Sequence, residues 1–434
     1  MPGTSQRRPA GADDGERRWR QVVGALVAVR VAIPLVTLAF SGHALPGLPP
    51  YRYQPLNGDS FGFYAATREF ISSLGHVSRP LLLVAFVLVV GATAIGVRLW
   101  RGSPGQRVVA LLVPAAALSL AVTLPIREMH TPGAAVFGWP LLWSIPLGPI
   151  RAVGLGPSPD TAFVVGLPLT LVALGVAVIA TAYVGRYATG RRSVGLIAAA
   201  LFTVWPLASG QVVGHSAWEN GQWNVDVGLH LYTEPLSTAL VVASVALLLR
   251  PATQQLGLAG AGLAIGYAAV VKLTNGVVGL ALAVLVAWRY GLRQAVPYVA
   301  GGLVSLPILL AYWPKGYVGM FDGATSASSR PWALSYADDA WTHSLIFTPR
   351  LLLLLAPLLL VGGFAIRDRW VLAVVCAPIV VDAVVYSFYS ATAVHPRFLY
   401  VALPFVFVLE AAGAASLADA VRRRRRPAHQ VRVL

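Results

Sequence analysis

Residues 161–184 have the sequence TAFVVGLPLTLVALGVAVIATAYV, in which no side chain is charged. A helix of about 20 apolar residues is long enough to cross the hydrocarbon core of a bilayer. Inside a bilayer the backbone must satisfy its own hydrogen bonds, which a helix does. The stretch therefore predicts a membrane-spanning helix, and similar stretches recur along the chain.

The whole chain has the composition of a membrane protein. Its 434 residues are 57% hydrophobic and only 12% charged, whereas a soluble domain is about 25% charged. The mean hydropathy is +0.69. These figures exclude a disordered chain, a fibrous protein and a soluble globular enzyme. The single cysteine, Cys376, excludes an internal disulfide and a cysteine-based metal cluster.

Twelve apolar segments are predicted spans, which indicates an all-α polytopic membrane protein with amphipathic surface helices in its outer loops. The segments lie near residues 21–40, 81–99, 108–126, 161–184, 193–210, 231–249, 257–272, 275–289, 295–313, 346–366, 370–390 and 397–418. The predicted transmembrane domain is 21–418, between basic tails at 1–20 and 419–434. No convincing cleavage site follows the first span, which we interpret as an uncleaved signal anchor.

The charges predict the orientation. With the N-terminus in the cytoplasm, 22 of the 33 basic residues fall on the inner side, as the positive-inside rule requires. We therefore attribute the net charge of +16 to topology rather than to nucleic-acid binding. The run Arg422–Arg426 fits either contact with anionic lipid headgroups or a plain topological stop signal. Ten of the 17 acidic residues fall in outer segments. We expect a plasma-membrane protein with both termini cytoplasmic and its chemistry on the outer face.

The first outer loop contains a predicted surface helix. Phe63, Thr67, Phe70 and Ile71 recur at helical spacing, as in an amphipathic helix lying on a membrane. Asp59 stands just before this helix, where a helix cap belongs. Two roles fit this residue. Its carboxylate is either only a cap or a general base held beside the membrane.

A second outer segment, 127–160, is rich in tryptophan and proline. Pro140 and Pro146 interrupt its apolar stretch, which argues for a surface-lying or re-entrant segment rather than a clean span. Trp139 and Trp143 are most simply explained as anchors at the membrane interface.

The third outer segment, 215–226, has the sequence HSAWENGQWNVD. Its amides, carboxylates and tryptophans resemble a sugar-binding surface, where rings stack on the sugar and polar groups bind hydroxyls. Glu234 follows at the start of a predicted span. An unpaired carboxylate would be costly to bury there, so we expect Glu234 to have a partner.

Three cations are candidates for binding an anion. Arg397 opens the last span after His395 and either grips a phosphate or extends to lipid headgroups. Lys272, one of two lysines, lies at a tight turn between two spans. Arg30 lies about 15 Å into the first span by helix rise, and a charge at that depth is a functional candidate. No zinc signature, phosphate-binding loop, nucleophile elbow or dinucleotide fingerprint is present.

In their order, these motifs resemble those of the GT-C membrane glycosyltransferases, and most closely the branch of protein O-mannosyltransferases and lipid A aminoarabinose transferases. Ser60 departs from the family, which often has a second acidic residue there. The family also tends to keep both surface segments in one loop, whereas two predicted spans separate them here. The motifs that carry the resemblance are Arg30, residues 59–66 with Glu69, and residues 130–148, 232–236, 268–276 and 395–400.

The resemblance implies a polyprenyl-phosphate sugar as donor, a glycolipid, glycan or protein as acceptor, and transfer with inversion on the outer face. Asp59 would be the general base, and Arg397 with Lys272 or Arg30 would hold the donor phosphate. No cofactor is implied, and a divalent metal ion is neither required nor excluded. The lysine-poor composition, rich in Ala, Val, Gly and Arg, is typical of a GC-rich bacterial genome and suggests mannose or arabinose. The residues expected to bind sugar or acceptor are Tyr64, His215, Glu219, Asp226, Tyr232, Glu234 and His395.

Two other classes stay open. A secondary transporter or lipid flippase could use Asp382, Arg30 and His395 as a proton or substrate path. The chain could also be a non-catalytic envelope protein. Transporters often show inverted repeats, whereas this chain is asymmetric and has its polar residues outside, which favours a transferase.

Overall fold

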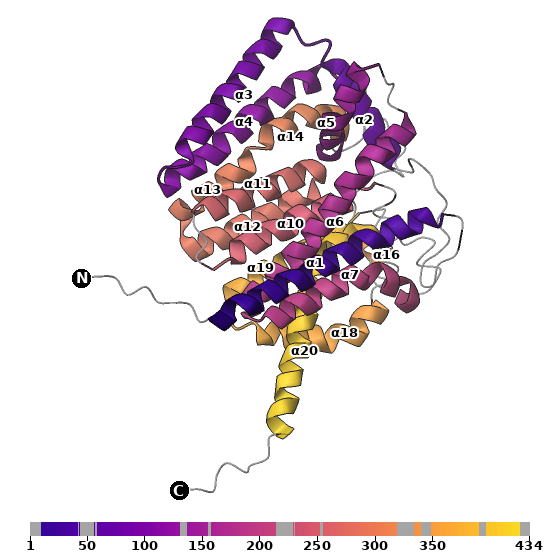
Figure 1. Ribbon diagram of the computed structural model, residues 1–434, viewed down its shortest axis with the longest axis vertical. Helices are drawn as coiled ribbons and strands as arrows, with labels where there is room; N and C mark the ends of the chain where they lie inside the picture. The colour runs from indigo at the N-terminus through magenta and orange to yellow at the C-terminus, as the bar shows by residue number, and fades with distance from the viewer. Residues whose placement is uncertain are drawn as a thin grey trace, which may run out of the picture.

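The computed structural model describes residues 10–41, 43, 56, 59–130, 137–154, 158–213, 229, 231–251, 255–318, 334–339, 349–389 and 396–425. Within these ranges the regular elements are helices, which confirms the all-α prediction (Figure 1). They are α1 (Ala10–Ala39), α2 (Asp59–Ser73), α3 (Arg79–Leu99), α4 (Pro104–Glu128), α5 (Gly138–Ala152), α6 (Pro159–Thr189), α7 (Arg192–Val213), α10 (Glu234–Leu249), α11 (Gln255–Val271), α12 (Thr274–Tyr290), α13 (Leu292–Leu303), α14 (Leu306–Trp313), the π-helix η1 (Pro314–Val318), α16 (Tyr336–Asp339), α18 (Pro349–Ala365), α19 (Arg369–Ser387), the 3₁₀ helix η4 (Pro396–Ala402) and α20 (Leu403–Arg425).

The described helices are those of a multi-pass membrane protein. Six of them are long and apolar enough to cross a bilayer, and the pair α13–α14, bent by 43°, would make a seventh. The six are Asp14–Ala39, Arg79–Leu99, Pro104–Glu128, Pro159–Thr189, Arg369–Ser387 and Arg397–Arg424.

Each of the twelve predicted segments coincides with a helix or, for 295–313, with the bent pair. The helices α7, α10, α11 and α12 and the apolar part of α18 have shorter apolar stretches of 10–17 residues. The structure thus supports the positions of the predicted segments. That all twelve cross the membrane, and which side each terminus faces, stay predictions.

The helical boundaries differ from the predicted tails. Helix α1 already begins at Ala10 and α20 continues to Arg425, so parts of the predicted tails 1–20 and 419–434 are helical. The prediction placed each boundary where the apolar stretch ends. A helix satisfies its own backbone hydrogen bonds, however, and therefore continues into water without a break.

Ion pairs hold these helical extensions to one end of the bundle. Glu16 of α1 pairs with Arg186 and Arg192 near the α6–α7 turn, each at 3.0 Å. At the same turn Arg191 pairs with Asp419 of α20 at 2.6 Å. Three of the segments that the positive-inside rule assigned to one side of the membrane therefore lie together: the start of α1, the α6–α7 turn and the end of α20.

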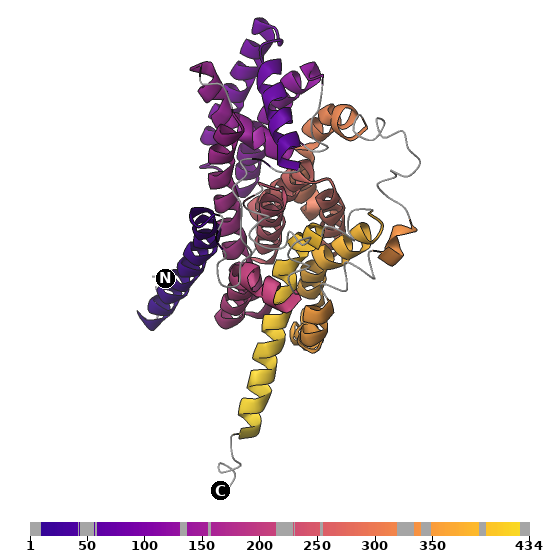
Figure 2. The same ribbon diagram turned by 90° about the vertical axis from the view of Figure 1, so that its right-hand side faces the viewer.

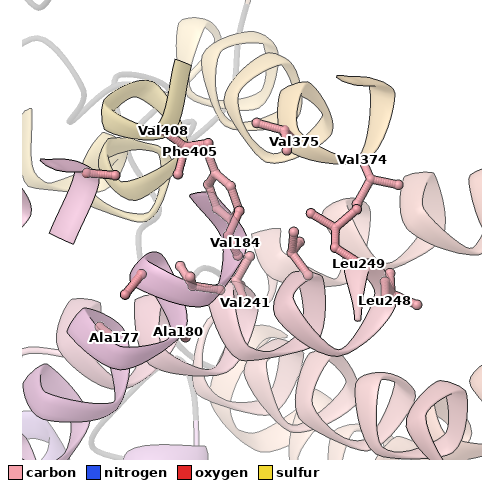
Figure 3. Close-up of a cluster of buried hydrophobic side chains, with 14 of the residues drawn as sticks. Ala177, Ala180, Val184, Val241, Leu248, Leu249, Val374, Val375, Phe405 and Val408 are labelled. Carbon is pink, nitrogen blue, oxygen red and sulfur yellow. The ribbon is translucent and has the colours of Figure 1, made fainter. Parts of the chain in front are cut away.

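The largest apolar core lies between α6, α7, α10, α19 and α20 (Figure 3). Val184 of α6, Val241 of α10 and Phe405 of α20 are fully buried where these helices meet. The sixth helix thus packs against elements that lie far away in sequence, and α20 passes through the centre of the bundle.

Helices α3 and α4 form a hairpin at the opposite end from the projecting part of α20 (Figures 1 and 2). Helix α3 packs mainly on α4, and large side chains such as Leu83, Phe86 and Val97 are more than 60% exposed. An exposed apolar surface of this extent is expected where a helix faces lipid.

Glycines allow several helix pairs to approach closely. A Cβ at Gly262 of α11 would overlap the carbonyl oxygen of Tyr298 in α13, and one at Gly266 would overlap that of Gly302. The same relation joins Gly362 of α18 to the backbone of α20. Small residues at such crossings are typical of membrane helices, which gain little from the hydrophobic effect when they associate in lipid.

Two glycines on α11 give a matched test of this packing. We expect Gly262→Ala to lower the thermal unfolding midpoint in detergent, because the methyl group meets backbone that must shift, at a cost of about 1–3 kcal/mol. Gly260→Ala is the control, since its Cβ would lie 3.5 Å from Leu247 Cδ1, an ordinary contact. Equal midpoints for the two variants would contradict this account of the crossing.

Candidate functional site

Four charged side chains from distant parts of the chain form one cluster, called here the charged cluster: Asp59, Glu234, Lys272 and Arg397. Asp59 Oδ2 lies 2.6 Å from Arg397 Nη2, and Lys272 Nζ lies 3.1 Å from Glu234 Oε1. Arg397 Nε lies 4.0 Å from the same Glu234 oxygen, which joins the two pairs. Negative and positive groups alternate, so the formal charges cancel.

Only one side chain of the charged cluster, that of Asp59, is exposed to solvent. The Asp59 side chain is 56% exposed, whereas those of Glu234, Lys272 and Arg397 are 2%, 11% and 6% exposed. A charge loses its hydration when it is buried and needs a partner of opposite sign. The partner expected for Glu234 is therefore present, and it is Lys272.

Aromatic rings surround the two cations. The Arg397 guanidinium lies over the ring of Tyr232, 4.0 Å from its centroid, and also near Phe398. Lys272 Nζ lies 4.7 Å from the Phe398 centroid and 4.9 Å from that of Tyr386, and these two rings stack on each other. Cation–π contacts of desolvated groups are worth about 2 kcal/mol. They hold both cations without adding negative charge.

Tyr389 lies just past the end of α19, beside the charged cluster. Its ring packs edge-on against Phe398. Burial is the main cause that raises the pKa of its phenol; the carboxylates of Asp59 and Glu234 add to the rise and the nearby cations oppose it.

The turn between α11 and α12 fixes Lys272. Asn275 donates hydrogen bonds from Nδ2 to the carbonyl of Ala268 and to the hydroxyl of Ser237 in α10. The hydroxyl of Thr274 and that of Tyr386 are 2.6 Å apart. These bonds tie the turn to the helix that carries Glu234, so the Lys272–Glu234 pair is held from both sides.

Helix α5 supports the segment before Glu234. Trp139 Nε1 donates a hydrogen bond of 2.7 Å to the carbonyl of Leu231. Leu231 has a φ of 55°, the only positive φ of a non-glycine residue in the described ranges, and such a conformation needs support from its surroundings. The bond thus helps to place Tyr232 and Glu234, which follow directly.

This arrangement overturns the interpretation of the α5 tryptophans as interfacial anchors. Trp139 and Trp143 are fully buried and pack on each other, between α5 and neighbouring elements. Proline and tryptophan content gives no direction for a side chain. The proline-containing stretch forms a 15-residue helix whose start lies against the backbone at Val271, directly before the Lys272 turn.

The predicted surface helix is present as α2. Phe63, Thr67 and Phe70 are buried on one face, as their spacing predicted. Asp59 is the first residue of the helix rather than the residue before it. Because Thr67 donates a hydrogen bond to the carbonyl of Pro140 in α5, the two surface segments meet although α3 and α4 separate them in sequence.

Arg30 is buried at 3% exposure but has its own partners. It donates a hydrogen bond to the hydroxyl of Tyr400, and its guanidinium lies 5.1 Å from the centroid of Phe202. Tyr400 belongs to η4, which also carries Arg397. The structure therefore connects Arg30 to the charged cluster through η4, not through a direct ion pair.

The structure divides the remaining predicted site residues into two groups. Tyr64 lies in the apolar cluster with Trp139 and Leu231, and Arg68 lies over its ring. The other four lie outside the described residues: His215, Glu219, Asp226 and His395.

Sequence patterns did not indicate three supporting residues. Trp139, Asn275 and Tyr386 position the charged cluster, but the sequence indicated Trp139 only as an interfacial anchor and Asn275 only as part of the segment 268–276. Asn275 and Tyr386 are polar residues next to apolar segments, but this local pattern does not indicate which distant residue either one contacts.

Comparison with protein-family models and with curated protein sequences finds no match for this chain. The geometry of the charged cluster therefore carries the functional argument.

The ion pair predicts a specific pattern of stability. We expect Glu234→Gln to lower the free energy of unfolding by about 3–5 kcal/mol, because a buried pair has lost one partner. The double variant Glu234→Gln/Lys272→Gln should lose less than the two single variants together, because neither charge remains buried alone. Thermal or denaturant unfolding in detergent measures the coupling. Strictly additive losses would contradict the pairing.

Proposed function

We propose that this protein is an integral-membrane glycosyltransferase. It would move a sugar from a polyprenyl-phosphate donor to an acceptor hydroxyl on the outer face of the membrane. The observation that best supports this proposal is the charged cluster, in which the exposed carboxylate of Asp59 is paired with the buried Arg397 beside the membrane-spanning helices. The resemblance of the motifs to GT-C enzymes supports the same class.

Asp59 has the properties that a general base requires. Its carboxylate is more than half exposed, so an acceptor hydroxyl can reach it, and Arg397 Nη2 holds it at 2.6 Å. A base must lie within hydrogen-bond reach of the proton that it removes. The position at the start of a surface helix keeps the group at the edge of the bundle.

Arg397 is the cation best suited to the donor phosphate. Its Nε and Nη1 atoms are buried and have no hydrogen-bond partner among the described residues, although Nη2 binds Asp59. Buried donors without a partner are costly, and a phosphate oxygen would satisfy them with charge-assisted bonds. Lys272 is already paired with Glu234, so we assign it to holding that carboxylate rather than to first contact with the phosphate. Arg30, engaged by Tyr400, steadies η4.

The proposed reaction is one displacement. The acceptor oxygen attacks the anomeric carbon while the bond from that carbon to the phosphate oxygen breaks, and the configuration inverts. Asp59 takes the hydroxyl proton, and the electron pair of the broken bond leaves with the polyprenyl phosphate. Arg397 stabilises the charge that develops on that leaving group. Tyr232, held against Arg397, would line the sugar site.

The role of Asp59 predicts a loss of transfer. We expect Asp59→Asn to reduce sugar transfer from a labelled polyprenyl-phosphate donor by about 10²–10⁴-fold, with purified protein in lipid and an acceptor pool of envelope lipids. Asp160→Asn is the matched control, because Asp160 also lies in the first turn of its helix, α6. Transfer at the wild-type rate by Asp59→Asn would remove this residue from the chemistry.

The role of Arg397 predicts that charge alone is insufficient. We expect Arg397→Lys to lower kcat/KM for the donor by about 10²–10³-fold, since an ammonium group cannot bind Asp59 and a phosphate in the planar geometry of a guanidinium. The unfolding midpoint of the variant, measured in parallel, separates this loss from misfolding. A kcat/KM within a few-fold of wild type at an unchanged midpoint would refute the role.

A transporter remains the second candidate because of buried carboxylates. Asp382 in α19 is 1% exposed, and its Oδ2 has no hydrogen-bond partner among the described residues. Glu410 in α20 is 2% exposed, and both of its carboxylate oxygens likewise have no hydrogen-bond partner there. Acidic groups inside a helical bundle often belong to ion pathways. Flux of sugar lipid or protons in proteoliposomes, lost in Asp382→Asn but retained in Asp59→Asn, would favour this function.

A further inference from the structure

A cavity of about 670 Å³ lies at the basic end of the bundle, between the α6–α7 turn, the α18–α19 turn and α20. Arg397 stands at the start of the helical stretch that leads into α20, and the cavity lies near its other end, at Arg423. At 1.5 Å of rise per residue, the first lining residue of α20, Ala412, lies about 22 Å from Arg397 along the helix, and the last, Arg423, about 39 Å. The cavity is therefore separate from the charged cluster.

One face of α20 forms a wall of this cavity. Ala412, Ser416, Asp419 and Arg423 follow each other at intervals of three or four residues and all line it. Ala412 is buried and Arg423 is exposed. The wall thus changes from apolar inside the bundle to charged at the mouth.

The opposite walls show the same gradient. Val361 and Phe364 of α18 and the buried Val194 of α7 supply apolar surface. Arg191 and Arg367 stand at the two turns, where they are exposed. Phe364 is 84% exposed, as expected of an apolar side chain that faces lipid at the edge of the cavity.

The three arginines that line the cavity outnumber its two carboxylates, which leaves a formal net charge of +1. Of its two carboxylates, Asp419 pairs with Arg191 at 2.6 Å, and Asp368 accepts hydrogen bonds from the backbone N–H groups of Trp370 and Val371. Arg367 and Arg423 have no carboxylate partner among the described residues. The C-terminal residues beyond the described part contain no aspartate or glutamate.

We propose that this cavity binds the phosphate of an anionic phospholipid from the leaflet at the basic end of the bundle. Arg367 and Arg423 would bind the phosphate at the mouth. The glycerol and the first part of an acyl chain would lie along Phe364, Val361 and the Ala412–Ser416 face of α20. Basic pockets between membrane helices have the charge and position that such headgroups require.

The cavity opens where the apolar parts of α18 and α20 end, and the exposed ring of Phe364 lies beside its arginines, which favours a lipid over a soluble phosphate ester. A small hydrophilic phosphate would use the arginines but gain nothing from Phe364 or Val361. A lipid would use both, since burial of apolar surface adds free energy in proportion to the area covered. This proposal does not depend on the proposed sugar transfer.

The test is binding of phosphatidylglycerol to the purified full-length protein in neutral detergent, measured by native mass spectrometry and lipid titration. Arg367→Gln/Arg423→Gln should weaken binding at least fivefold. Arg98→Gln/Arg101→Gln is the charge-matched control, because both arginines lie exposed around the α3–α4 turn, away from the cavity. The control should bind as the wild type does.

Two further experiments are needed. The first distinguishes binding in the cavity from general electrostatic attraction to the basic surface, and the second distinguishes a lipid ligand from a free phosphate. Ser416→Phe places a bulky ring on the α20 wall of the cavity without changing charge and should also weaken binding at least fivefold. Glycerol 3-phosphate should not displace the lipid, even at a concentration that would saturate a site that binds phosphate through arginines alone. Equal losses in the control variant, unchanged binding by Ser416→Phe, or displacement by glycerol 3-phosphate would each overturn the proposal.

Discussion

The buried carboxylate of Glu234 needs positive charge, and the arrangement of the surrounding helices follows from how that need is met. Lys272 lies at 3.1 Å and Arg397 at 4.0 Å from the same oxygen. One of these cations comes from the α11–α12 turn and the other from the 3₁₀ helix before α20. Because neither could be buried alone without a large desolvation cost, the ion pairs join the middle and the C-terminal part of the chain, and Asp59 adds the surface helix.

The scaffold around these charges consists of contacts that each restrict one segment. Trp139 holds the strained backbone at Leu231, and Asn275 ties the Lys272 turn to Ser237 of α10. Neither residue carries charge, yet both determine whether the charged cluster keeps its geometry. This explains why one face of α5, a short helix between two longer ones, is fully buried at Trp139 and Trp143: Trp139 is part of the support for the site.

Helix α20 connects the two chemically distinct ends of the molecule. At one end η4 presents Arg397 to Asp59 and Tyr400 to Arg30, and at the other the last turns of α20 present Asp419 and Arg423 to the basic cavity. Between them the helix is packed closely in the core, with Gly413 against the backbone of α18. Small residues in the middle of α20 allow neighbouring helices to pack closely against it, although both ends of α20 are polar.

Local sequence was enough to predict the helices, because the length and spacing of apolar residues depend only on local order. The stretch 161–184, the buried face of α2 and the need of Glu234 for a partner could all be predicted in this way. Tertiary structure alone decided which cation meets which carboxylate, that Arg30 binds Tyr400 instead of joining the charged cluster, and that Trp139 points inward. Those outcomes depend on contacts between residues up to 370 positions apart, for which periodicity and composition carry no information. The ion pairs of Glu16 and Asp419 with the distant α6–α7 turn are of the same kind, and local sequence gives no sign of them.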